Sequence, residues 1–461
     1  MTERRREAYF AAGVGLLLAA GLVLDLTSGD VPPAEAEAGG RGGFEAHSVF
    51  CPGAVAGGAA DVDLVIVAPE GDRLAVGIEP QEGETAEVPR EGALIYDVSG
   101  SEPADIVGYG APAGVAVLTS TERPGAGAGA AGCARTAGAN WYFAAGSASL
   151  EADERILLYN PFPDEAVVRL SLFTPEGEQT KASLADVAVP ANAFTVVPLN
   201  EKVGVENTLA VHVAAERGRV VAWRQTFVSG RDRVPGMAFS LGAARPSALW
   251  HFPDGAVGGG SSERISILNP SQEEAVVAIS LAVGRDEVVA PPDLMELAVP
   301  PRSQLVVGLG AHVETGDEPV AVAASVRSVN DVPVVAEREV VVDGAEGRGI
   351  AAEVGSSADA LRWLVPPAAR NSSADAIAIL NPATEPATVS LRLLDRNGVE
   401  IAAPGLEAVE IGPGGRVRIP VARWTAGKPV LALVDATVPV VVERSAIAAG
   451  DAVALMGLPL R

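Results

Sequence analysis

Four short landmarks recur in the same order three times along this sequence. A tryptophan comes first, an apolar stretch ending in Asn-Pro follows, a second apolar stretch comes after an acidic turn, and an arginine within a valine-rich stretch ends the series. The tryptophans are Trp141, Trp250 and Trp363, the asparagines are Asn160, Asn269 and Asn381, and the arginines are Arg224, Arg338 and Arg444. Four landmarks in one order, with a period of about 110 residues, predict a tandem array of similar domains.

A degenerate fourth copy precedes these three. Pro52 corresponds to Pro253, because an apolar stretch ends 16 residues after each of them. In the first copy that stretch ends at Ala68 instead of asparagine, and Thr119 occupies the place of the arginine. The predicted boundaries are 45–138 for repeat 1, 139–246 for repeat 2, 247–360 for repeat 3 and 361–461 for repeat 4.

Within one copy the hydrophobic period is two. Val168, Leu170 and Leu172 fall on one face of a predicted strand. The 51 glycines and 34 prolines also disfavour long helices. For repeat 2 we predict seven strands, near 155–160, 166–174, 184–189, 193–198, 207–215, 219–228 and 237–241. Seven short strands in one repeat are typical of an antiparallel β-sandwich of the immunoglobulin-like type, so the predicted fold class is all-β.

The N-terminal segment carries a targeting signal. Three arginines at positions 4–6 precede an uncharged, apolar run from Ala8 to Leu24. We predict a cytoplasmic basic tip at 1–7, a single-pass transmembrane signal anchor at 8–26 and a flexible stalk at 27–44. The positive-inside rule then puts the C-terminal domains outside the cytoplasmic membrane. The alternative is a cleaved signal peptide, for which Ala34 to Ala36 offers a cleavage pattern.

The chain has two cysteines, Cys51 and Cys133, and both lie in repeat 1. An even number of cysteines outside the cytoplasm favours a disulfide. A bridge between them closes a loop of 82 residues and contributes about 4 kcal/mol in the chain-entropy model. We interpret repeat 1 as a terminal repeat in which the predicted disulfide compensates for a poorer core.

Charge and motifs exclude several classes of function. The 59 acidic residues exceed the 34 basic ones, for a net charge of −25, which disfavours nucleic acid as a partner. The sequence contains no nucleophile elbow, zinc-protease motif, phosphate-binding loop or calcium loop, and no dinucleotide fingerprint set between a predicted strand and a helix. The histidines, His47, His212, His251 and His312, are isolated from one another in the sequence. We therefore predict neither an enzyme nor a cofactor or metal site.

The shared residues have structural and functional interpretations. Asparagine before proline at a strand end is a turn device, because its side chain caps the backbone two residues on. We interpret the tryptophans as packing residues, with an exposed carbohydrate platform as the alternative. The arginines interrupt apolar strands. Each is expected to clamp loop carbonyls or a carboxylate of the next domain, and a repeated anion-binding groove is the alternative.

With these landmarks the chain resembles a family of actinobacterial secreted proteins known only as a domain of unknown function. The resemblance rests on the WYF and WHF openings, the Asn-Pro strand ends, the later arginine strand and the single N-terminal anchor. It implies a location in the cell envelope and no assigned activity. Leu364-Val365 after the third tryptophan, and Trp223 where later copies have glutamate, depart from the repeated pattern.

From these observations we expect a noncatalytic structural or binding protein of the bacterial cell envelope. The expected partner is a protein or a glycan of that envelope. The alternative is a glycan-binding accessory protein of an envelope polysaccharide or glycosyl-transfer system, which would recognise sugar through its tryptophans.

Overall fold

The computed structural model describes residues 46–52, 60–68, 73–79, 85–98, 104–109, 113–121, 127–230, 233–285, 287–344 and 347–460. They all belong to one compact unit, Glu45–Arg461. The predicted basic tip, anchor and stalk at 1–7, 8–26 and 27–44 lie outside the described residues. Among the described residues no helix has the length and apolar character needed to cross a bilayer.

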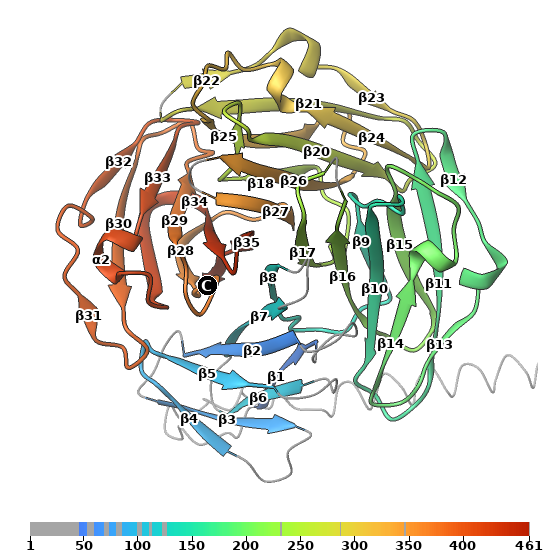
Figure 1. Ribbon diagram of the computed structural model, residues 1–461, viewed down its shortest axis with the longest axis horizontal. Helices are drawn as coiled ribbons and strands as arrows, with labels where there is room; N and C mark the ends of the chain where they lie inside the picture. The colour runs from blue at the N-terminus through green and yellow to red at the C-terminus, as the bar shows by residue number, and fades with distance from the viewer. Residues whose placement is uncertain are drawn as a thin grey trace, which may run out of the picture. The chain divides into compact units, whose positions relative to one another are not determined.

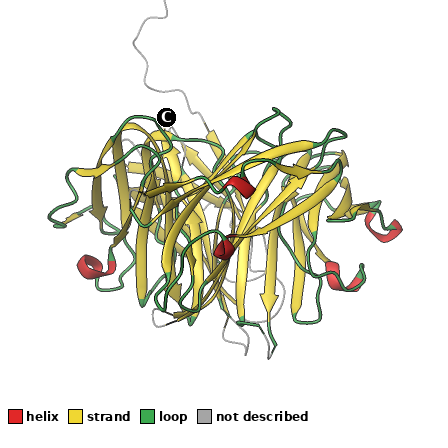
Figure 2. Cartoon of the chain, turned by 90° about the horizontal axis from the view of Figure 1, so that it is seen from above, coloured by secondary structure: helices red, strands yellow, loops and turns green. Residues whose placement is uncertain are grey.

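Strands are the main element of this unit (Figures 1 and 2). Repeat 1 contains β1 (Ala46–Cys51), β2 (Ala60–Val67), β3 (Arg73–Glu79), β4 (Thr85–Pro89), β5 (Ala93–Asp97), β6 (Ala104–Tyr109), β7 (Gly114–Thr121) and β8 (Ala128–Gly132). Repeat 2 contains β9 (Asn140–Phe143), β10 (Ala152–Asn160), β11 (Ala166–Thr174), β12 (Gly177–Gln179), β13 (Val187–Val189), β14 (Ala193–Pro198), β15 (Ala210–Arg217), β16 (Val221–Val228) and β17 (Gly236–Leu241).

The second half of the chain continues in the same way. Repeat 3 contains β18 (Leu249–Phe252), β19 (Ala256–Val257), β20 (Ser262–Asn269), β21 (Ala275–Val283), β22 (Glu287–Val289), β23 (Leu297–Val299), β24 (Ser303–Gly308), β25 (Val320–Ser328), β26 (Val335–Gly344) and β27 (Gly347–Val354). Repeat 4 contains β28 (Ala360–Val365), β29 (Ala374–Leu380), β30 (Ala387–Leu394), β31 (Glu400–Ile401), β32 (Val409–Ile411), β33 (Arg416–Pro420), β34 (Leu431–Ala448), β35 (Asp451–Met456) and β36 (Leu458–Leu460). The helical elements are η1 (Ala182–Leu184), η2 (Leu199–Glu201), η3 (Pro292–Leu294), η4 (Leu309–Ala311) and α2 (Ala422–Thr425).

The described strand pairs are all antiparallel, and one strand order recurs. An inner sheet has the order β5-β2-β7-β8 in repeat 1, β14-β10-β16-β17 in repeat 2 and β24-β20-β26-β27 in repeat 3. Repeat 4 follows the same plan with β33, β29, β34 and β35. A second sheet completes each repeat, for example β12-β11-β15-β9 in repeat 2. The fold is therefore all-β and resembles a series of β-sandwiches.

The last strands of the inner sheets meet at the centre of the unit. β17 lies against β8 and β27, and β35 lies against β27 and β8, so the four strands form a closed cycle (Figure 1). Their sequences are rich in alanine and glycine, from AGAAG in β8 to DAVALM in β35. Small side chains allow four strands to approach one another closely.

The cores of neighbouring repeats are continuous. One buried apolar cluster joins repeats 1 and 2, and another joins repeat 4 to repeat 1. The predicted bridge between Cys51 and Cys133 is confirmed, and it ties β1 to the residue that follows β8. The disulfide therefore connects the first strand of repeat 1 to the strand that this repeat contributes to the centre.

Candidate functional site

The three repeated tryptophans lie in the cores. Trp141, Trp250 and Trp363 are at most 3% exposed. Their indole Nε1 atoms donate to the carbonyl oxygens of equivalent valines at 2.7, 2.8 and 2.9 Å. A buried indole needs such an acceptor. The alternative of an exposed carbohydrate platform is therefore wrong for these tryptophans, because their rings are covered by the surrounding core.

The three asparagines that end the apolar strands are fully buried. In repeat 2, the Nδ2 group of Asn160 donates to the carbonyls of Asp164, Val189 and Pro190, at 2.7 to 3.2 Å. Its Oδ1 atom accepts from the amide of Phe162, two residues on. Asn269 and Asn381 repeat this pattern. Each asparagine thus forms a turn and also holds a second strand, β13 in repeat 2.

Two of the arginines reach across a junction to the next repeat. The guanidinium of Arg224 in repeat 2 forms a bidentate ion pair with Glu337 in repeat 3, with Nη1 at 3.0 Å from Oε2. Arg338 in repeat 3 pairs in the same way with Glu443 in repeat 4, again with one 3.0 Å contact. All four side chains are buried. In repeats 3 and 4 the glutamate therefore pairs with the arginine of the preceding repeat, and in repeat 3 the adjacent arginine pairs with the glutamate of the next repeat.

Among the described residues of repeat 1, Arg444 in repeat 4 has no such partner. Its guanidinium instead forms a bidentate pair with Asp375 of its own repeat, at 2.8 and 2.6 Å, and donates to the carbonyls of Pro366 and Val430. The repeat 1 residue that corresponds to Glu443 is Leu118, within the apolar cluster between repeats 4 and 1. Within the described residues, the junction that closes the cycle has other ion pairs in place of the repeated one, Arg370 with Asp63 and Arg392 with Glu91.

The junction between repeats 1 and 2 replaces the ion pair with aromatic packing. Thr119 stands at the arginine position, and Trp223 stands at the glutamate position. Phe50 of repeat 1 packs edge to face against Tyr159 of repeat 2, with ring centres 6.3 Å apart, and the indole Nε1 of Trp223 donates to the carbonyl of Gly132 in repeat 1 at 3.3 Å. Because the arginine position and the glutamate position both hold uncharged residues here, neither position buries a charge without its counter-ion.

Several buried carboxyl groups stand near these ion pairs. Burial raises the pKa of Glu154 to about 7 and of Glu263 to about 8, although Arg224 and Arg338 respectively oppose the shifts. Burial also raises the pKa of Glu353 well above its usual value. Within the described residues, neither carboxyl oxygen of Glu263 has a hydrogen-bond partner. Sequence reasoning missed these buried carboxyl groups. Glu154 and Glu263 occupy a repeated acidic position, six residues before the repeated asparagine, and Asp375 occupies the same position in repeat 4.

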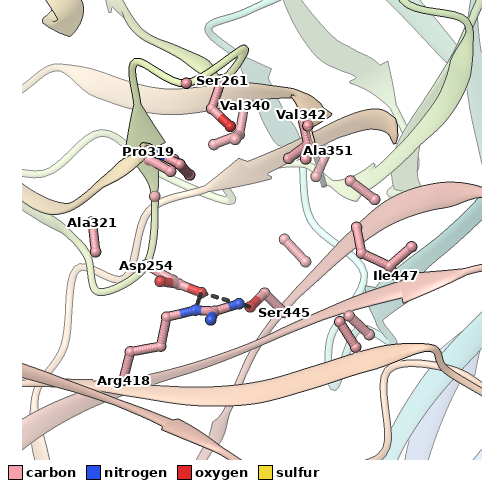
Figure 3. Close-up of a pocket in the computed structure, with 18 of the residues that line it drawn as sticks. Asp254, Ser261, Pro319, Ala321, Val340, Val342, Ala351, Arg418, Ser445 and Ile447 are labelled. Carbon is pink, nitrogen blue, oxygen red and sulfur yellow. Dashed lines mark hydrogen bonds and ion pairs between the residues drawn. The ribbon is translucent and has the colours of Figure 1, made fainter. Parts of the chain in front are cut away.

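The junction between repeats 3 and 4 carries a further charge cluster, shown in part in Figure 3. Asp254 contacts Arg416 at 2.7 Å, Arg418 at 3.2 Å and the hydroxyl of Ser445 at 2.5 Å. Burial opposes ionisation of Asp254, yet Arg418 and Arg416 hold the pKa of this carboxyl well below its usual range. No sequence motif pointed to Asp254, because its arginine partners follow it by more than 160 residues.

At the centre one carboxylate joins all four repeats. Asp451 begins β35 directly after the turn Ala449-Gly450, in which both residues have positive φ. Its oxygens accept from the amides of Ala128 at 3.2 Å, Met237 at 2.5 Å and Ile350 at 2.8 Å, one each from repeats 1, 2 and 3. Burial raises the pKa of Asp451 to about 7, against the opposing effect of these amides.

Glycines make room for this carboxylate. A Cβ atom on any of three glycines near the central strands would overlap the Asp451 carboxylate; they are Gly127, Gly236 and Gly349. A glycine at the start of three central strands is a weak signal on its own. Sequence reasoning missed Asp451, although these glycines together with the single acidic residue of β35 are a signal that could have found it.

Comparison with known proteins gives a family without an activity. A model described as Family of unknown function (DUF5719) matches residues 103–231 and 240–452. No curated protein matches the chain. Among solved structures, a crystal structure of Thermotoga maritima 1070 is 22% identical, with coverage of 24% of this chain and 95% of its own, and a TM-score of 0.20. At that score no relation between the folds follows.

Proposed function

The chain belongs to the Family of unknown function (DUF5719), and on that premise we propose that it is a noncatalytic structural or binding protein of the bacterial cell envelope. The family supplies no activity to transfer, so the proposal depends on the residues themselves. The side chains that the repeats share are buried against backbone groups or carboxylates. This burial is the observation that supports a structural role most directly.

Among the described residues, the hydroxyl of Ser445 contacts the carboxylate of Asp254. A serine nucleophile needs a base that takes its proton near neutral pH. Asp254 is a poor base, because Arg416 and Arg418 stabilise its ionised form and hold its pKa low. The contact is therefore better explained as part of an ion-pair network than as a nucleophile and its base.

The finer features of the proposal come from the sequence. We propose that each repeat is an immunoglobulin-like sandwich, because two antiparallel sheets enclose its tryptophan. We also propose that residues 8–26 anchor the chain in the cytoplasmic membrane and that residues 45–461 lie outside it. The disulfide supports an oxidising location for repeat 1. An actinobacterial source is part of the same proposal.

Cell fractionation tests the proposed location. The full-length protein should remain with membranes after a carbonate wash, and protease added to spheroplasts should digest it. Recovery of a soluble form that begins near Glu37 would show a cleaved signal instead. Protection from protease in intact spheroplasts would place the repeats in the cytoplasm and contradict the proposal.

A binding comparison tests the proposed role. Residues 45–461, immobilised in the oxidised form, should retain an envelope protein that survives a salt wash and should not retain purified cell-wall glycan. Retention of glycan alone would favour the accessory protein of a polysaccharide system. Turnover of an envelope glycan or peptide by the purified protein would contradict a noncatalytic role.

A further inference from the structure

A cavity of about 350 Å³ lies between the inner sheets of repeats 3 and 4 (Figure 3). Small or branched apolar side chains on β26, β27, β34 and β35 form most of its wall. Val342 and Ala351 lie on the repeat 3 side, and Ile447 and Ala452 lie on the repeat 4 side. A concave site of this size with a mostly apolar wall is typical of a small-molecule pocket.

A small residue at a repeated position helps to open this cavity. Val341 lies three residues after the repeated arginine of repeat 3, and its cross-strand partner is Ile350. Ile350 belongs to a buried apolar cluster at the junction between repeats 2 and 3. In repeat 4 the equivalent cross-strand pair is Ile447 with Ala452, and both of these residues line the cavity. The smaller alanine side chain therefore leaves space where the preceding junction packs an isoleucine.

A glycine in the loop before β20 makes a second difference of the same kind. Gly259 lines the cavity and corresponds to Leu150, because each lies ten residues before a repeated asparagine. Gly259 has a φ of 55°, and a Cβ atom at this position would overlap Pro319 on the cavity wall. The repeated architecture accepts larger residues at both positions, so it does not require this cavity. That difference points to a role beyond packing.

The two arginines of the cavity wall are already engaged. Arg338 forms a buried ion pair with Glu443. Arg418 contacts the carboxylate of Asp254 at 3.2 Å and the hydroxyl of Ser445 at 3.5 Å. A negative group on a ligand would have to compete with these carboxylates for the guanidinium groups, so the inner end of the cavity gives an anion little advantage.

The rim of the cavity carries negative charge. Asp317 and Glu318 line the cavity just before β25, and both side chains are exposed. Within the part of the chain that the structure describes, neither carboxylate takes part in an ion pair. These two charges attract a cation to the mouth of the cavity and repel an anion. An apolar interior below a negative rim is complementary to a molecule with an apolar body and a positive end.

We propose that this cavity binds a small primary amine with an apolar body. The body would contact the valine, isoleucine and alanine wall, and the ammonium group would lie at the rim beside Asp317 and Glu318. Burial of apolar surface would supply most of the affinity, and the rim carboxylates would supply the preference for a cation. This binding activity goes beyond the structural role proposed above and does not depend on where the protein resides.

Titration calorimetry of the oxidised 45–461 unit with three probes of equal chain length tests this inference. We expect octylamine to bind most tightly, 1-octanol to bind about three- to tenfold more weakly, and octanoate to bind more weakly still, because each rim carboxylate acts through solvent. Asp317→Asn combined with Glu318→Gln should lower the affinity for octylamine to that for 1-octanol. Unchanged octylamine affinity in this variant would overturn the placement of the ammonium group.

Glu273→Gln combined with Glu274→Gln is the matched control, because it removes two adjacent exposed carboxylates from the turn before β21. This variant should bind octylamine like the wild type.

Ala452→Ile tests the cavity itself, because it introduces the residue that repeat 3 has at the equivalent position. Its side chain should fill the cavity and weaken the binding of octylamine and of 1-octanol about tenfold or more. A cooperative melting curve would show that the variant is folded. Absence of octylamine binding to the wild type, octanoate binding as tight as that of octylamine, or wild-type affinity in folded Ala452→Ile would overturn the proposal.

Discussion

A guanidinium group withdrawn from water must be matched by a carboxylate or by several carbonyl groups, or its burial destabilises the fold. Arg224, Arg338 and Arg444 each satisfy this requirement, although two use the next repeat and one uses its own. At the residue scale the structure therefore explains why arginine interrupts an apolar strand.

Arg338→Ala should lower the free energy of unfolding by about 2 to 4 kcal/mol, because it leaves Glu443 buried without its counter-ion. Arg338→Lys should restore little, since an ammonium cannot form the bidentate contact. Chemical denaturation followed by fluorescence measures the effect. Arg362→Ala at an exposed pair is the control and should cost less than about 1 kcal/mol. Equal stability of Arg338→Ala and the wild type would rule out the clamp.

Glu263→Gln should change how stability depends on pH. The folded-state pKa of Glu263 is about 8, above its usual value of 4.5, so folding takes up a proton in this range. The contribution of Glu263 to the free energy of unfolding of the wild type is greatest below about pH 4.5, and it is lost as the pH rises toward 8. Glutamine does not ionise, so the stability of the variant relative to that of the wild type should increase as the pH rises through this range. Melting curves from pH 5 to 9 would show this.

Glu274→Gln provides the comparison, because this side chain is exposed on the turn before β21. Its melting temperature should follow that of the wild type at every pH. If Glu263→Gln did the same, Glu263 would be ionised or solvated in the folded protein, and the interpretation of this buried carboxyl would be wrong.

At the scale of elements, sequence periodicity predicted the strands of repeat 2 well. The expected strands at 166–174 and 193–198 coincide with β11 and β14. The short strands β9 and β12 were missed, because three or four residues are too few to show a period of two. The partners of the arginines were also out of reach, since Glu337 and Asp375 are assigned by the arrangement of the repeats.

The disulfide is the element-scale feature with the clearest test. Cys51→Ser with Cys133→Ser should lower the unfolding free energy by about 4 kcal/mol, because the bridge closes a loop of 82 residues in the unfolded chain. Denaturation of this variant and of the oxidised wild type measures the difference. Hydrogen exchange should locate the loss in repeat 1. A change that is confined to repeat 3 would contradict this assignment.

At the scale of the whole unit, the four repeats differ in how they meet. Aromatic and apolar packing joins repeats 1 and 2, the repeated arginine–glutamate pairs join repeats 2 to 3 and 3 to 4, and an apolar cluster with two peripheral ion pairs joins repeat 4 to repeat 1. Wrong pairing would bury a charge without its partner, which disfavours other orders of the repeats. The carboxylate of Asp451 then connects the four central strands at one point.

The claim that Asp451 holds the four repeats together is tested most directly by hydrogen exchange at its three partner amides. At pH 8 the amides of Ala128, Met237 and Ile350 should be strongly protected in the wild type. Ala128 and Met237 donate to one carboxylate oxygen and Ile350 donates to the other, so Asp451→Asn, which puts an N–H group in place of one oxygen, should remove protection from the amides that donate to that oxygen. Asp435→Asn, at an exposed ion pair, should change none of them. Unchanged protection in Asp451→Asn would contradict the account.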